Sequence, residues 1–467
     1  MKLIKKFFSF SIGSFVGIFI SILSLPILTR IISPEEFGYA TLFLNIGLVL
    51  SVLAMAGVDQ AFIRYFHQSN QQTLFKKTLL VSLSASFLIG ITIYIFDDEF
   101  SNLILEENSY VFLMCFYILC LILSRFANLI LRMQQFAIRF SVVEVTRKVC
   151  DFLFVIGLAL LFIPNHYALI LGYSLSLLIS GIISLLLSRK FWSKPNENFN
   201  EVPTYKEILS YSVPFMLSGA LLILIQTLDK ILLGYWGTAQ EVGIYSASFK
   251  LVALISIVQH TFNLFWTPVY LENYKDFPED NELYSKVSRL MTIIMLSLCV
   301  LVILSKDFII LFLGSDYQKQ SSLIAALVLM PALMTMSETT MIGINLKLKA
   351  KYHLYISLVV LFISLTLNII LIPLAGMKGA AFSVAVSYIT FYLLRTIVGQ
   401  KLVHYEIKLK STLILIMLIL TWISIILFYS DSSYVIYSGA IIILVLLFTF
   451  FFDDIKYSKK FISNLRG

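Results

Sequence analysis

Long apolar runs dominate this 467-residue sequence. They recur along the whole chain at about 20 residues each, the length at which an α-helix crosses a bilayer core. The residues are 59% hydrophobic and 13% charged, whereas a soluble domain has about 45–50% apolar and about 25% charged residues. A closed β-barrel would show shorter, alternating segments instead. The sequence therefore predicts an all-α integral membrane protein with many spans.

We predict about 14 transmembrane helices from these runs. The N-terminal run follows lysines, as in a signal peptide, but no small-residue cleavage site closes it, so we expect a retained first helix. The predicted spans are 7–32, 40–63, 74–96, 110–131, 145–163, 167–188, 208–234, 243–270, 289–313, 322–346, 353–374, 377–399, 411–429 and 433–452.

Lysine and arginine are distributed unevenly between the two sides of these spans. With the N-terminus inside, 29 of the 35 lie on the inner side, five lie at outer ends, and Lys250 lies within a span. One missed span would invert every later connection, so this bias supports the predicted order. Both termini are then expected to be cytoplasmic. The net charge of +8 is explained by topology, and no nucleic-acid partner is expected.

A motif near the first span recurs in the second half of the chain. Arg30 ends an apolar run and is followed by Glu-Phe-Gly-Tyr at 36–39; Lys230 ends another and is followed by Glu-Val-Gly-Ile-Tyr at 241–245. Six spans separate the copies, which indicates a parallel repeat of two six-helix lobes around a central cavity. We expect an N-terminal lobe at 1–190, a cytoplasmic linker at 191–206, a C-terminal lobe at 207–400, and two extra helices with a tail at 401–467.

Polar residues inside the spans gather in the first two helices of each lobe. Ser14, Gly17, Ser21 and Ser24 share one face of the first span, ahead of Pro26, which permits a kink. Ser246, Lys250 and Thr261 are predicted to share one face of the eighth span, and Ser256, Gln259 and Asn263 another. The candidates for cavity lining or ion coupling are Asp59, Gln226, Asp229, Gln259, His260, Asn263 and Glu338.

Four cations, Arg30, Arg64, Lys230 and Lys250, lie in or at the ends of the same spans. Ionisable groups cost a few kcal/mol at bilayer depth, so they usually face a cavity or a partner. The cations outnumber the aspartates of these spans, which favours an anionic substrate such as a phosphate or diphosphate.

Each of these charges also has a structural explanation that the sequence leaves open. Arg30 and Lys230 could reach the outer interface by snorkelling, and Arg64 could be an inner-side anchor. Asp59 could pair with Arg64, and Lys250 with Asp229. His260, the histidine in the middle of a span, is more typical of packing than of a proton relay.

No motif of an enzyme or of a nucleotide-driven pump is present in the sequence. The acidic pairs at 35–36, 97–98 and 453–454 stand at helix ends, where carboxylates usually cap helices or meet water. The four cysteines lack metal-ligand spacing. We therefore expect no catalysis, metal or cofactor, and transport driven by an H⁺ or Na⁺ gradient, the membrane potential or consumption of the product.

With these residues in view, the chain resembles bacterial polysaccharide flippases of the Wzx type, in the MOP superfamily that also contains lipid II flippases and MATE drug exporters. The resemblance is carried by residues 9–17, 25–39, 57–66, 229–234 and 241–245. It implies two lobes around a central cavity. It also implies transfer of an undecaprenyl-diphosphate-linked oligosaccharide, for O-antigen, capsule or another surface polysaccharide, from the cytoplasmic to the outer leaflet of the bacterial plasma membrane.

The resemblance also assigns roles and partners. The diphosphate would be bound by Arg30, Arg64 and Lys250, with Lys230 beside them; Lys250 stands where the family often has arginine. Expected partners are the lipid-linked glycan, membrane lipid, and the polysaccharide polymerase and chain-length regulator, with the protein itself a monomer. The competing functions are a MATE-type drug exporter, a lipid II or teichoic-acid precursor exporter, and a membrane-embedded polymerase.

Overall fold

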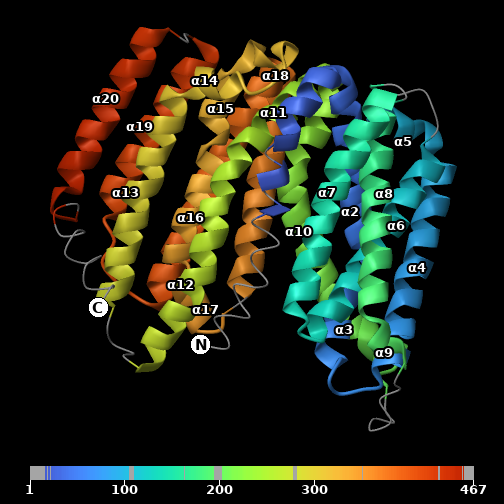
Figure 1. Cartoon of the computed structure of the whole chain (residues 1–467). Helices are drawn as coiled ribbons and strands as arrows, with labels where there is room; N and C mark the ends of the chain where they lie inside the picture. Colours follow the sequence, from blue (N-terminus) through green and yellow to red (C-terminus); the bar gives the residue numbers. More distant parts are fainter. Residues whose placement is uncertain are drawn as a thin grey trace. The chain divides into compact units, whose positions relative to one another are not determined.

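The computed structural model describes residues 16–17, 19–21, 23–104, 110–161, 164–193, 202–276, 281–349, 351–429, 432–454 and 456. In these ranges the regular structure is helical, without strands, which confirms the all-α prediction (Figure 1). Ten described helices are long and apolar enough to cross a membrane. The chain is thus a multi-pass membrane protein, and the total of 14 crossings stays a prediction.

The helices gather into two compact units, Met1–Ile244 and Tyr245–Gly467. This division follows the packing of the chain: α10 (Tyr205–Trp236) packs against α2 and α3 and therefore belongs to the first unit. The lobes at 1–190 and 207–400 were predicted from the repeated motif and not from packing, so their boundaries stay a prediction.

The first unit begins its described part with a helix over Phe19–Ile31. Figure 1 shows α3 and α9 at one end of this unit and α5 at the other. Its remaining helices are α2 (Pro34–Met55), α3 (Val58–Tyr65), α4 (Gln71–Ile95), α5 (Asp97–Ile104), α6 (Val111–Met133), α7 (Ala137–Leu161), α8 (His166–Leu187), α9 (Arg189–Ser193) and α10, followed by the start of α11 (Ala239–Val252).

The predicted span 40–63 is two helices rather than one. Ser33 caps α2 by accepting a hydrogen bond from the backbone N–H of Glu36, and Pro34 occupies the first turn. Ala56 and Gly57 then take left-handed conformations with φ of 48° and 68°, which ends α2 and starts α3. A Cβ on Gly57 would lie 2.3 Å from the carbonyl oxygen of Ser212, so only glycine permits both the turn and the packing of α10.

The second unit contains the end of α11 and the helices up to the C-terminus. These are η1 (Ala253–Ile255), α12 (Ser256–Asp276), α13 (Glu282–Leu304), α14 (Lys306–Ile310), η2 (Ser315–Gln320), α15 (Ser322–Leu327), α16 (Leu329–Thr340), α17 (Ile342–Leu346), α18 (Lys351–Leu402), α19 (Leu409–Phe428) and α20 (Ser433–Phe450).

Four predicted spans in the second half are interrupted or joined. The span 243–270 is broken by the 3₁₀ turn η1, and 322–346 is divided among α15, α16 and α17. The spans 353–374 and 377–399 form the continuous segment α18, which breaks at Gly376, where φ is 54° and ψ is −134°. The break falls between these two predicted spans.

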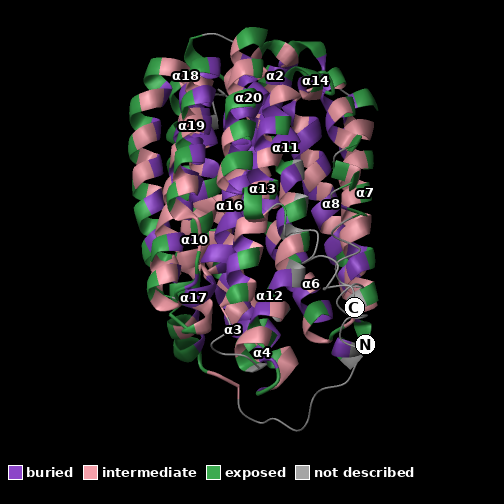
Figure 2. Cartoon of the chain, turned by 90° about the vertical axis from the view of Figure 1, so that its left-hand side faces the viewer, coloured by how far each residue is buried: buried purple, intermediate pink, exposed green. Residues whose placement is uncertain are grey.

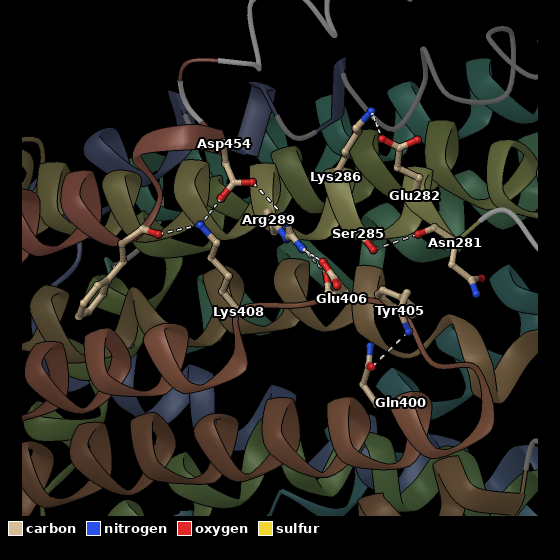
Figure 3. Close-up of polar contacts among 11 residues, drawn as sticks. Asn281, Glu282, Ser285, Lys286, Arg289, Gln400, Tyr405, Glu406, Lys408 and Asp454 are labelled. Carbon is tan, nitrogen blue, oxygen red and sulfur yellow. Dashed lines mark hydrogen bonds and ion pairs between the residues drawn. The ribbon is translucent and has the colours of Figure 1, made fainter.

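Within the second unit, an ion network connects the ends of α19 and α20 to α13 (Figure 3). Arg289 of α13 lies 3.0 Å from the carboxylate of Glu406 and 3.3 Å from that of Asp454. Lys408 lies 2.8 Å from Asp454 and donates to the carbonyl oxygen of Phe450 at 2.8 Å. The segment after α18 and the end of α20 are thereby held to α13, which also packs against α20.

The outward faces of these helices are apolar, as a lipid environment requires. Along α20, Ile436, Ala440, Ile443 and Leu447 are buried, while Ile441, Leu444 and Phe448 are among its exposed apolar side chains. Figure 2 shows this alternation of buried and exposed positions along α20. The exposed apolar surface is consistent with a helix that packs on one side and meets acyl chains on the other.

Some predictions fall on residues outside the described ranges. These are the N-terminal lysines, the opening of the first span with Ser14, and residues 194–201 of the linker 191–206. The orientation of the termini also stays a prediction.

Candidate functional site

A cavity of about 470 Å³ lies inside the first unit, among α2, α3, α6 and α10. The break between α2 and α3 turns the start of α3 toward this space, and Gly219 of α10 leaves room beside Val52. The cavity is lined by Leu48, Ser51, Val52, Met55, Gly57, Asp59, Gln60, Leu121, Ile122, Arg125, Phe215, Met216, Ser218, Gly219, Leu222 and Ile223.

An ion pair borders the cavity. A guanidinium nitrogen of Arg125, on α6, lies 3.0 Å from one carboxylate oxygen of Asp59, and the Gln60 amide donates to the same oxygen at 3.1 Å. Asp59 stands in the first turn of α3, where the helix dipole stabilises a carboxylate. The alternative in which Asp59 pairs with Arg64 is wrong, because α3 directs Asp59 to a residue 66 positions away.

The two members of the pair differ sharply in exposure. The Asp59 side chain is 9% exposed, whereas the Arg125 side chain is 62% exposed. A guanidinium carries five N–H donors, and the contact with Asp59 uses one nitrogen. An arginine in a membrane helix is costly unless it faces water, a partner or a ligand, so Arg125 is well placed to bind an anion entering the cavity.

The predicted cations of the first unit have different surroundings. Arg30 is exposed at the end of the first described helix and donates to the carbonyl oxygen of Pro26 at 3.0 Å. Arg64 is exposed in the last turn of α3. None of these three cations, Arg30, Arg64 or Lys230, is among the residues that line the cavity.

Lys230 is buried rather than exposed. Its ammonium lies 3.2 Å from Asp229 and donates to the carbonyl oxygen of Gln226 at 3.0 Å. Only 6% of Lys230 and 2% of Asp229 are exposed. This geometry is unlike that of a snorkelling lysine, and the two charges largely offset each other. A role for Lys230, Asp229 or Gln226 in substrate or ion binding stays a prediction.

The candidates of the second unit are spread over several helices. Lys250 is exposed on α11, Gln259 is buried and Asn263 is half-buried on α12, and the side chain of His260 lies outside the described residues. The turn η1 lies between Lys250 on α11 and Thr261 on α12 and interrupts the helix that was predicted to carry Ser246, Lys250 and Thr261, and their shared face stays a prediction. The functional roles of these residues stay predictions.

Glu338 pairs with Arg395 inside the second unit. One guanidinium nitrogen lies 3.1 Å from Glu338 and 3.2 Å from the hydroxyl of Ser337. The guanidinium also lies over the ring of Phe391 at 4.2 Å. Both charged side chains are 14% exposed, so each is enclosed by protein.

The repeated motif meets itself at one helix crossing. A Cβ on Gly38 would lie 1.7 Å from the carbonyl oxygen of Ala239, and one on Gly243 would lie 1.8 Å from that of Pro34. The glycine of each copy therefore permits the start of α2 and the start of α11 to touch through their backbones. The close backbone approach at this crossing explains why each copy of the motif has a glycine two residues after its glutamate.

Arg125 is the residue that sequence reasoning missed. It lies inside the predicted span 110–131, yet its position near the end of that span resembles that of an inner-side anchor. The position of Arg125 inside the span could have identified it, because an arginine several residues within an apolar run needs a partner or a cavity. Asp59, a predicted site residue, is that partner.

Comparison with known proteins identifies the family and the fold of this chain. Residues 3–274 match the family described as "Polysaccharide biosynthesis protein". No curated protein matches the chain. Among solved structures, "Lipid II flippase MurJ, inward closed conformation" aligns with a TM-score of 0.70 and 14% identity, covering 97% of this chain and 99% of that one.

MATE transporters have the same fold. An inward-facing multidrug resistance MATE family transporter of the MOP superfamily aligns with a TM-score of 0.57 and 16% identity, covering 84% of this chain and 93% of that one. A mutant of the Vibrio cholerae MATE transporter VcmN aligns with a TM-score of 0.55 and 14% identity, covering 86% and 97%. The chain therefore belongs to the polysaccharide biosynthesis protein family and has the fold of MOP-superfamily transporters.

Proposed function

We propose that this protein is a flippase that moves undecaprenyl-diphosphate-linked oligosaccharides from the cytoplasmic to the outer leaflet of the bacterial plasma membrane. The observation that carries the proposal is Arg125, a largely exposed cation that borders a cavity inside a membrane unit. Membership of the polysaccharide biosynthesis family supports a glycan substrate. The likeness to a protein named as a lipid II flippase supports a lipid-linked one.

The cavity suggests how the substrate binds. The diphosphate accepts hydrogen bonds from Arg125, since an arginine can bind phosphate oxygens through two nitrogens at once. Sugar hydroxyls contact Ser51, Gln60 and Ser218, which also line the cavity. The polyprenyl tail stays in the bilayer, where its transfer to water would be costly. The chemistry is binding and release by alternating access, without a covalent step.

The remaining features of the proposal follow from the sequence. Both termini are cytoplasmic, and the protein acts as a monomer beside a polymerase and a chain-length regulator. An H⁺ or Na⁺ gradient, the membrane potential or product consumption drives transfer. The product serves O-antigen, capsule or another surface polysaccharide.

A drug exporter is the second candidate, because the MATE structures share the fold. Such a transporter for cationic drugs needs uncompensated carboxylates. Asp59 is the carboxylate on the cavity wall, and Arg125 lies 3.0 Å from it. This pairing leaves the cavity without a net negative charge, which favours the anionic substrate. A lipid II or teichoic-acid precursor also carries phosphate. It differs from the oligosaccharide substrate proposed first in its glycan.

The proposal is tested by introducing Arg125→Ala in a cell whose surface glycan depends on this protein. We expect glycan display per folded molecule to fall roughly 10–100-fold, since a hydrogen bond to a charged group contributes about 1.5–3 kcal/mol. The matched control is Arg132→Ala, which removes an exposed arginine from the last turn of the same helix, away from the cavity. Equal display by the two variants would contradict the proposal.

Purified protein in liposomes then separates the substrates. Transfer of a defined lipid-diphosphate glycan, without transfer of a cationic dye, supports the flippase; the reverse supports the exporter. The same assay with Arg30→Ala and Lys250→Ala asks whether these predicted cations take part.

A further inference from the structure

A buried histidine joins three helices at one end of the first unit. His166 is the first residue of α8, Glu36 stands in the first turn of α2, and Tyr110 immediately precedes α6. The other ends of α2 and α8 lead to α3 and α9, at the opposite end of the unit in Figure 1. None of the three residues is among the predicted site residues.

The contacts of the imidazole are short and directional. Its Nδ1 lies 2.6 Å from Glu36 Oε2, and the backbone N–H of His166 donates to the same oxygen at 2.6 Å. Its Nε2 lies 2.7 Å from the hydroxyl of Tyr110. The His166 side chain is 6% exposed, whereas that of Glu36 is 30% exposed. The carboxylate therefore connects a buried imidazole to the solvent-accessible surface.

These contacts fix which nitrogen can change its protonation. A carboxylate only accepts hydrogen bonds, so Nδ1 carries the hydrogen toward Glu36. In the neutral imidazole, Nε2 then accepts from the Tyr110 hydroxyl. When a proton is taken up at Nε2, that nitrogen becomes a donor to the Tyr110 oxygen, and the hydroxyl hydrogen must turn to another acceptor. Proton binding thus strengthens the pair with Glu36 and reverses the bond to Tyr110.

Charged and aromatic groups surround the site. Aromatic rings enclose the site: the Tyr39 ring centroid is 5.5 Å from that of His166, and the Tyr167 centroid is 4.2 Å away. Among the described residues, the other charged groups near this end are Glu35 of α2, which accepts from Tyr39, the acidic start of α5 at 97–99, the pair Asp229–Lys230 of α10, and Glu241 of α11.

We propose that His166, Glu36 and Tyr110 form a proton-binding site at the end of the first unit where α2 and α8 begin, which is the predicted outer end. Histidine is the side chain whose unperturbed charge changes between about pH 5 and 8. The site acts on the helices that carry the cavity: Tyr110 precedes α6, which holds Arg125, and α2 supplies Ser51 to the cavity wall. Its role in driving transfer rests on the proposed function; proton binding itself does not.

Proton binding is measured directly by NMR of ring-labelled histidine in the full-length protein in nanodiscs. The chain has five histidines, and the His166 signal is assigned by its loss in His166→Gln. We expect this signal to change with pH as Nε2 takes up a proton. Glu36→Gln and Tyr110→Phe should each move its midpoint, because the first removes the negative charge beside Nδ1 and the second removes the hydroxyl partner of Nε2. A signal without titration, or a midpoint that neither variant moves, would overturn the site.

Transport at varied outer pH tests the coupling. We expect the wild-type rate to change with outer pH, because proton uptake by His166 alters its contacts with Glu36 and Tyr110. His166→Gln should abolish this dependence, and Tyr110→Phe should shift it without unfolding the protein. The control, His67→Gln, removes an exposed histidine of the same unit and should retain the wild-type profile.

The two proposals fail in different ways. If glycan transfer is absent for the wild type at every pH while His166 still titrates, the proposed function fails and the proton site stands. If transfer depends on pH equally in wild type and His166→Gln, coupling through this site is excluded while the flippase function stands.

Discussion

Each unit contains an arginine–carboxylate pair, and the two pairs differ in what surrounds them. The Arg125–Asp59 and Arg395–Glu338 distances are 3.0 and 3.1 Å. The Arg125 side chain is 62% exposed and borders a cavity, whereas that of Arg395 is 14% exposed and lies over Phe391. Equal distances therefore do not imply equal roles. Exposure decides whether the cation is available to a ligand or serves to hold helices together.

The largest expected effect is on stability, in the second unit. Arg395→Ala would leave the enclosed Glu338 carboxylate without its partner, and breaking a buried pair in this way costs about 3–5 kcal/mol. Thermal unfolding of the purified protein should show a clear loss. Lys401→Ala, an exposed change in the last turn of the same helix, is the control. If both variants unfolded at the wild-type temperature, Arg395 would not hold helices together, and its contrast with Arg125 would be lost.

A smaller effect is expected in the first unit from Asp59→Asn. The amide keeps the size of the side chain but leaves the charge of Arg125 uncompensated, so the cavity should hold a diphosphate more tightly and release it more slowly. Glycan transfer should fall by about 2–10-fold, less than for Arg125→Ala, with little change in stability. The comparison would break down if Asp59→Asn were more damaging to transfer than Arg125→Ala.

The smallest effect concerns a pair that lies beyond the end of the membrane helix α13 at Leu304, although the predicted span 289–313 included it. Lys306 lies 2.8 Å from Asp307, which also accepts from Ser321. Burial alone raises the pKa of Asp307, but the hydrogen bonds from Lys306 and Ser321 outweigh it and hold the pKa below its usual value. A lowered folded-state pKa stabilises the protein above the unfolded value, about 3.9, and this contribution is lost as the pH falls through the folded value.

Asp307→Asn should therefore lower the unfolding temperature slightly at neutral pH, and the difference should disappear at the acid end. Because the Asp307 side chain is 64% exposed, the effect should not exceed about 1 kcal/mol. Asp316→Asn, at an exposed position of η2, is the control. A difference that grew on acidification would contradict the assigned direction of the pKa.

The fold was more predictable than the site. Hydropathy located the membrane helices because lipid requires apolar faces on every span, and the boundary between 374 and 377 agrees with the break at Gly376. The interruptions at Ala56–Gly57 and at η1 were not predicted, since an apolar run gives no signal where its backbone changes direction. Charges near span ends were also ambiguous: Arg125 resembled an inner-side anchor.

The sequence by itself determined the membrane class and the repeated motif, because these depend on local composition and spacing. Tertiary structure decided the partners. It joined Asp59 to an arginine 66 residues away and His166 to a glutamate 130 residues away, and it brought Gly38 and Gly243 to one crossing. Such contacts depend on which helix faces pack together, and packing inside a membrane is chosen by shape and polar contacts rather than by hydrophobicity, which is similar on all sides.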